Sequence, residues 1–103
     1  MPTQYRVLGY ETLTIAASAL TLVGGVTGAR SFVGRLETAQ VRARGDGTAP
    51  TTSEGVLMEI GDVVVLSESE IANTQFIRTG STSGVLKGEF YTIEATAFAG
   101  RGA

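Results

Sequence analysis

The sequence predicts an all-β domain, either a small antiparallel β-sandwich or a jelly-roll-like barrel of about seven or eight short strands. Short runs in which apolar and polar residues alternate are cut by glycine, and Gly and Thr each occur 14 times. Proline stands only at Pro2 and Pro50, so the expected strand interiors are free of it. The runs recur about every 8–12 residues, a spacing typical of sandwiches and small barrels.

A chain of 103 residues suits one domain with one modest core, so we expect residues 1–103 to form a single β-sandwich domain. Residues 95–103 are small and rich in glycine, and they cannot pack strongly on their own. We therefore expect residues 1–4 and 95–103 to serve as extended arms.

The first half of the chain predicts up to five strands, and residues 23–30 between them predict a glycine-rich loop. The strands are expected at residues 4–10, 11–17, 18–22, 31–37 and 39–44. Tyr5 and Val7 share one face of the first run, and Leu13 and Ile15 point inward in the second. Helix propensity offers an alternative for 16–20, but the surrounding threonines and the following glycines favour strand. The last two runs are either separate strands or one long strand bent near Glu37.

The second half begins with a polar loop over residues 45–55 and then predicts four more strands. They are expected at residues 56–58, 63–66, 74–78 and 85–93. The run 63–66 is apolar throughout, which suits a strand buried on both faces. Ser67 with Glu70 three residues later resembles a capping box, so at most one helical turn follows. Phe32, Phe76 and Phe90 are expected in the core, with Tyr91 pointing away from it.

Composition excludes several kinds of function. The chain has neither Cys nor His, which excludes disulfides, zinc sites with N or S ligands, and His-dependent catalysis. The eight basic residues are scattered, so no block of positive charge predicts nucleic-acid binding. The segment 13–26 is too short and too polar to cross a membrane, and residues 1–4 do not resemble the start of a signal peptide. We expect no cofactor, no metal and no small-molecule substrate.

A charged fraction of only 17%, with Arg as seven of the eight basic residues, favours a surface that a protein partner covers. The candidate partner contacts are Arg6, Arg35, Arg42, Arg44 and Tyr91.

The tripeptide Arg44-Gly45-Asp46 suggests either cell adhesion or a corner of the fold. We interpret it as a strand end entering a glycine-assisted turn, because nothing else in the sequence indicates secretion. The structural turn motif comprises Gly45, Asp46, Gly47, Thr48, Pro50, Gly61 and Asp62. The acidic residues lack EF-hand spacing, and the pair Glu68 and Glu70 has no catalytic companions, so we expect no enzyme.

Two segments carry a family resemblance: RARGDGTAPTTSEGVLMEIGD at 42–62 and TQFIRTGSTSGVLKGEFY at 74–91. Their order of strand, Asp-Gly-Thr loop, Gly-Asp turn, Ile-Arg strand and terminal Tyr strand resembles the small β-sandwich virion proteins of tailed bacteriophages. The resemblance covers about half of the chain and rests on structural motifs, so it points to a fold more firmly than to a role.

The resemblance implies a structural virion protein, made in the bacterial host cytoplasm. The favoured role is a capsid decoration or cement protein on the outer surface of the phage head, where its partners are the major capsid protein, copies of itself, or both. The alternative is a tail- or fibre-associated receptor- or sugar-binding module. That role needs an exposed groove rich in aromatic or carboxylate side chains, which the sequence does not indicate.

Overall fold

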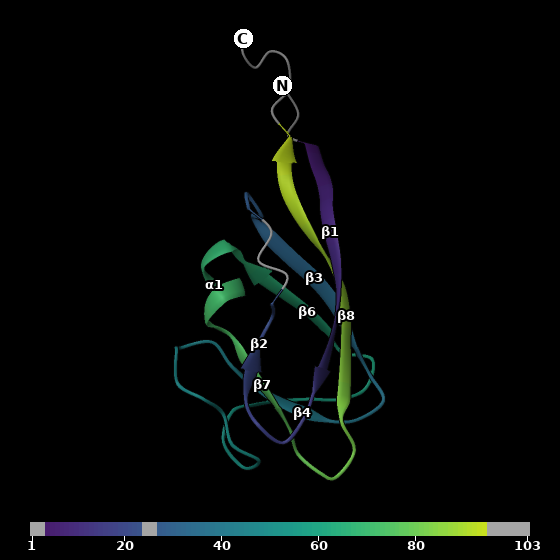
Figure 1. Ribbon diagram of the computed structural model, residues 1–103, viewed down its shortest axis with the longest axis vertical. Helices are drawn as coiled ribbons and strands as arrows, with labels where there is room; N and C mark the ends of the chain where they lie inside the picture. Colours follow the sequence, from purple (N-terminus) through teal and green to yellow (C-terminus); the bar gives the residue numbers. More distant parts are fainter. Residues whose placement is uncertain (1–3, 24–26, 95–103) are drawn as a thin grey trace, which may run out of the picture.

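The computed structural model describes residues 4–23 and 27–94, and it confirms the predicted all-β fold. Two four-stranded antiparallel sheets face each other as a β-sandwich with one short helix (Figure 1). The sheets do not close into a barrel, so the sandwich alternative is correct.

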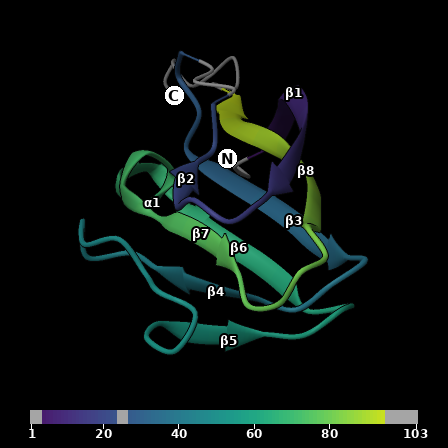
Figure 2. The same ribbon diagram turned by 60° about the horizontal axis from the view of Figure 1, so that its bottom comes forward.

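The first sheet has the order β1-β8-β3-β6 and the second the order β2-β7-β4-β5 (Figure 2). The first is built from β1 (Gln4–Ile15), β8 (Gly84–Glu94), β3 (Ser31–Glu37) and β6 (Val63–Ser67). The second is built from β2 (Leu20–Thr21), β7 (Gln75–Arg78), β4 (Val41–Arg44) and β5 (Val56–Met58). Helix α1 (Glu68–Asn73) follows β6, and Glu70 accepts the Ser67 N–H at 2.8 Å, as the predicted capping box requires.

Strand β1 joins two runs that the sequence suggested as separate, 4–10 and 11–17. No glycine pair or proline interrupts them, and a single bulge between Val7 and Gly9 absorbs the irregularity. Residues 16–19 form neither helix nor strand, and β2 covers only Leu20 and Thr21 of the strand expected at 18–22. The expectation of an arm at 1–4 is wrong for Gln4, which is paired with Glu94, and residues 1–3 and 95–103 lie outside the described residues.

The ends of β1 and β8 continue past the rest of the sandwich as a two-stranded ribbon (Figure 1). Tyr91 pairs with Ser31, the first residue of β3, so β8 has no β3 partner beyond that point. Among the described residues, the strand segments Gln4 to Arg6 and Thr92 to Glu94 therefore pair only with each other. We call this part the β1–β8 ribbon.

Strands β3 and β4 belong to different sheets, so the alternative of one long bent strand is wrong. Thr38 lies between them with φ of 74°, an uncommon backbone angle for a residue other than glycine. Its hydroxyl donates to the Ser83 carbonyl at 2.9 Å, which anchors the crossing to the start of β8.

Phe32, Phe76 and Phe90 fill the core as predicted. The rings of Phe32 and Phe90 lie on paired residues, with centroids 5.0 Å apart and planes at 57°. Gly34 and Gly88 are also paired on this inner face, and a Cβ at Gly88 would stand 2.4 Å from Phe32 Cζ. The two glycines therefore make room for the Phe32 ring.

The prediction that residues 63–66 form a strand buried on both faces is wrong, because β6 is exposed on one face. Val64 and Leu66 point into the core, whereas Val63 and Val65 are 54% and 65% exposed. β6 is an edge strand, and only its inner face meets the second sheet. The apolar residues on its other face lie on the molecular surface.

Candidate interaction surface

The first sheet presents apolar side chains on the face turned away from the second sheet. We call this surface the outer apolar face. Its apolar members are Tyr5, Val7 and Tyr10 of β1, Tyr91 and Ile93 of β8, Val33 of β3, and Val63 and Val65 of β6.

Strand register brings these side chains to one side. Tyr5 pairs with Ile93 and Val7 with Tyr91, so all four share a face. The β-bulge after Val7 then shifts the alternation by one residue, which places Tyr10 opposite Glu89 on that same face. Without the bulge, Tyr10 would point inward.

The exposure of this face is unusual for an antiparallel sheet, which normally turns polar residues to the solvent. Tyr10 is 61% exposed and Tyr5 65% exposed, and Val63 and Val65 are similarly open. Contiguous exposed apolar surface of this kind typically marks a site of contact with another molecule.

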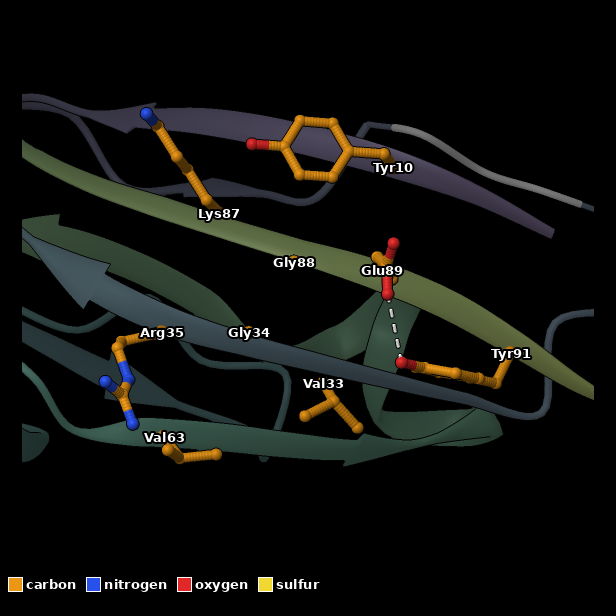
Figure 3. A pocket seen from close by; sticks show the side chains of 9 residues that line it. All are labelled: Tyr10, Val33, Gly34, Arg35, Val63, Lys87, Gly88, Glu89 and Tyr91. Atoms are coloured by element: carbon orange, nitrogen blue, oxygen red, sulfur yellow. Dashed lines mark hydrogen bonds between the residues drawn. The ribbon is translucent and has the colours of Figure 1, made fainter. Parts of the chain in front are cut away.

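A shallow open hollow of about 400 Å³ occupies the centre of the face (Figure 3). It is lined by Tyr10, Val33, Gly34, Arg35, Val63, Lys87, Gly88, Glu89 and Tyr91. The Tyr10 ring lies along β1, and the Thr12 hydroxyl donates to its oxygen at 3.4 Å. The charged groups of Arg35, Lys87 and Glu89 thus stand among apolar neighbours.

The polar groups of the hollow are held by local contacts. The Tyr91 hydroxyl donates to Glu89 Oε1 at 3.0 Å, and this hydrogen bond, with some burial, raises the pKa of Tyr91 above its usual value. Lys87 Nζ lies 3.6 Å from Glu37 Oε1 on the neighbouring strand. These exposed pairs orient side chains more than they stabilise the fold.

Of the five Arg and Tyr residues predicted to contact partners, Arg35 and Tyr91 lie on the outer apolar face. Arg6 alternates with Tyr5 and Val7, so it points to the opposite side of the β1–β8 ribbon. Arg42 and Arg44 lie in the second sheet. The structure therefore does not gather the five residues into one surface.

The two arginines of β4 hold the 45–55 loop. Arg42 donates from Nε to the Thr52 carbonyl at 3.0 Å and from Nη1 to the Gly55 carbonyl at 2.9 Å. The Arg44 guanidinium donates to both carboxylate oxygens of Asp46, with Nη2 2.9 Å from Oδ2. This pairing lowers the pKa of Asp46 and raises the pKa of Arg44. Both arginines are therefore engaged within the domain.

Within the Arg-Gly-Asp tripeptide, the two charged side chains form a salt bridge with each other. Asp46 also accepts the Thr48 N–H at 3.1 Å, and Gly47 has φ of 86°. Gly45 does not share this positive φ. Pro50 is buried at the end of the turn.

The Gly61-Asp62 turn connects β5 to β6. Asp62 accepts the Glu59 N–H at 2.8 Å, and Gly61 has φ of 95°. The Gly61 N–H donates to the Leu36 carbonyl at 2.8 Å, which ties the turn to the end of β3. These residues shape the fold and lie apart from the central hollow.

Sequence reasoning missed Tyr10, Val33, Val63, Val65 and Ile93 as surface residues. For Val63 and Val65 a signal was present, because strict alternation permits a run of four apolar residues to bury only two of them. For Tyr10 no local signal existed, since the bulge that turns it outward is seen only when β1 and β8 are paired.

The described residues hold no group of three or more acidic side chains placed to bind a metal ion, and no helix among them is long and apolar enough to span a membrane. No protein-family model, curated protein or solved structure matches the chain.

Proposed function

We propose that this protein is a structural virion component, a capsid decoration or cement protein that binds the outer surface of a phage head and stabilises its shell. The observation that supports this role is the outer apolar face. A sandwich completes its core with the inner faces of its two sheets, so a second apolar face is available to another protein. The family resemblance of 42–62 and 74–91 supports the choice of a virion.

The shape and chemistry of the face suit a broad, flat partner. Its central hollow is shallow. Charged groups of both signs stand among its apolar side chains, so the face favours a shell surface with complementary charges over a surface without them. Each Val or Tyr side chain that becomes fully buried contributes about 1.5–3 kcal/mol to association before entropy costs are subtracted. Many copies on one lattice add avidity to modest individual affinity.

The rest of the domain suits this role because its fold contains no disulfide bonds and its long loop is held by hydrogen bonds. The chain has no Cys, so its stability does not depend on an oxidising compartment. The long 45–55 loop is fastened by Arg42 and Arg44. A domain of this kind can fold in the host cytoplasm and then attach to a preassembled shell.

The proposal is tested by measuring the copy number of the chain in purified phage particles and by locating its density with cryo-electron microscopy. Hundreds of copies on the head surface, contacting the shell through the outer apolar face, are expected. Absence from particles would refute the virion role, and a few copies at the tail would support the alternative below.

A matched pair of variants tests the face itself. Val65→Lys places a charge on the outer apolar face, whereas Val56→Lys places the same charge on β5 of the second sheet, at a site with comparable exposure of 70%. We expect Val65→Lys to reduce occupancy on heads that lack the wild-type protein, and Val56→Lys to leave it unchanged. Equal loss with both variants would show that this face is not the one that binds.

The alternative role, a receptor- or sugar-binding module of the tail or fibre, gains one observation from the structure. Tyr10 and Tyr91 flank Glu89 in the hollow, and an aromatic ring beside a carboxylate is a common means of binding a sugar. A glycan array tests it directly. Specific binding that Tyr10→Ala abolishes would favour this role over decoration.

A further inference from the structure

The outer apolar face changes in character along its strands. Toward the β1–β8 ribbon its paired residues are apolar, as in the pair of Tyr5 with Ile93. At the other end of the central hollow, Lys87 of β8 pairs with Arg35 of β3, and both side chains are exposed. Two positive charges are therefore direct cross-strand neighbours, an arrangement that is unfavourable unless another group compensates it.

Only one of these two charges has a compensating group. Lys87 Nζ lies 3.6 Å from Glu37 Oε1. Within residues 4–23 and 27–94, no side chain forms a hydrogen bond or an ion pair with the Arg35 guanidinium. Figure 3 shows the two basic side chains pointing apart, Lys87 toward β1 and Arg35 toward β6. The charge of Arg35 and its N–H donors are thus left to the solvent.

Glu89 does not serve as a partner for Arg35. It is the only acidic residue among those that line the hollow in the described part of the chain, and it pairs across the strands with Val33. Its Oε1 accepts the Tyr91 hydroxyl at 3.0 Å, and Figure 3 shows this hydrogen bond on the side of the hollow away from Arg35. The hollow therefore keeps its own negative charge apart from the guanidinium.

A partner that covers the valines of β6 must also cover Arg35. Val63 is its cross-strand neighbour and is 54% exposed, and Val33 of the same strand as Arg35 is exposed as well. Removing water from a guanidinium without a partner costs free energy, so a purely apolar partner loses on this group part of what it gains on the valines. A carboxylate avoids that cost, because its oxygens match the planar fork of arginine and accept parallel hydrogen bonds from it.

We propose that the partner of the outer apolar face presents a carboxylate, from Asp or Glu, that pairs with Arg35 within an otherwise apolar contact. This inference rests on the proposed function, in which the partner is the shell of a phage head, and it names the chemical group that the shell must supply. Lys87, opposite Arg35, adds attraction for that group. The bound carboxylate in turn compensates the pair of like charges.

Co-sedimentation with phage heads that lack this protein, over a range of protein concentrations, tests the inference. We expect Arg35→Gln, which removes the charge, to raise the apparent Kd by about tenfold or more. Arg35→Lys keeps the charge and loses the planar fork, so its Kd should lie between those of the wild type and Arg35→Gln. Arg30→Gln is the matched control and should bind as the wild type does. Arg30 is also exposed, and its Nε lies 3.8 Å from Glu68 of α1, outside the lining of the hollow.

Charge reversal and added salt give two further measurements. Arg35→Glu should bind more weakly than Arg35→Gln, because a carboxylate then faces a carboxylate. Added salt should raise the Kd of the wild type more than that of Arg35→Gln, since salt screens a charge pair that only the wild type forms. Arg35 is exposed, so all of its variants should fold, which circular dichroism spectra and melting temperatures check.

The results distinguish a failure of this inference from a failure of the proposed function. Heads that bind none of the wild-type protein would refute the decoration role, and the carboxylate with it. Binding that Val65→Lys weakens and Arg35→Gln leaves unchanged would keep the role and overturn the carboxylate. Tighter binding of Arg35→Glu would overturn the carboxylate as well, because the partner would then carry positive charge at this position.

Discussion

The two faces of the first sheet are both apolar, yet they differ in their exposure to solvent. The inner face carries Phe32 and Phe90 against the second sheet and is almost inaccessible to water. The outer face carries residues such as Tyr10 and Val65 that are more than half exposed. Hydrophobicity alone therefore does not show which side of a strand forms the core, since the opposing sheet decides that.

The largest expected difference between the faces lies in the aromatic core. Phe90 is 1% exposed, and Phe90→Ala leaves a cavity that the neighbouring sheet cannot close, so we expect a loss of about 3–5 kcal/mol in the free energy of unfolding. Ile93→Ala on the outer side of the same strand should cost well under half as much. Urea denaturation of both variants measures the contrast, and similar losses would mean that the outer face is packed as tightly as the core.

A smaller effect is expected at the glycine pair of the inner face. A Cβ at Gly88 would stand 2.4 Å from the Phe32 ring and 2.5 Å from the Val33 carbonyl oxygen, and the backbone oxygen cannot move aside. Gly88→Ala should therefore destabilise the fold by about 1–3 kcal/mol through overpacking. Gly80→Ala is the control, because no atom lies within 4 Å of its Cβ position. Equal denaturation midpoints would argue against the close approach.

Changes on the outer face should separate stability from binding. In the double variant Val63→Thr, Val65→Thr both residues keep their strand preference, and since neither is buried each should change the free energy of unfolding by no more than about 0.5 kcal/mol. Attachment to phage heads, measured by co-sedimentation, should fall sharply. Intact attachment would exclude β6 from the interface.

The smallest expected effect is a dependence on alkaline pH. The Glu89 hydrogen bond, with some burial, raises the pKa of Tyr91, so the neutral tyrosine favours the folded state. This contribution is complete below the unfolded pKa of about 10 and disappears as the pH rises through the higher folded pKa. Tyr91→Phe removes it, so the melting temperature of the variant should decline less than that of the wild type between pH 9 and 11. Parallel declines would show that the bond is not formed in solution.

Much of the fold could be predicted because its signals are local. The glycine-bounded run 31–37 coincides with β3, the capping box at Ser67 marks α1, and the three buried phenylalanines follow from strand alternation. The fold class required only the spacing of such runs along the chain.

The features of the fold that the sequence did not predict depend on contacts between distant segments. The chain crosses between the sheets at Thr38, so two segments that could have been one bent strand are two strands. The bulge after Val7 is seen only when β8 is placed beside β1. Val63 and Val65 look like core residues until the order of the sheets makes β6 an edge strand. The outer apolar face could not be predicted for the same reason, since its members come from four strands whose register only the folded chain determines.

The pairing of Gln4 with Glu94 has a practical consequence for engineering. Both residues lie at the same pole, so polypeptides fused upstream and downstream of the domain would emerge side by side. Two halves of a split reporter attached in this way would reassemble on each copy.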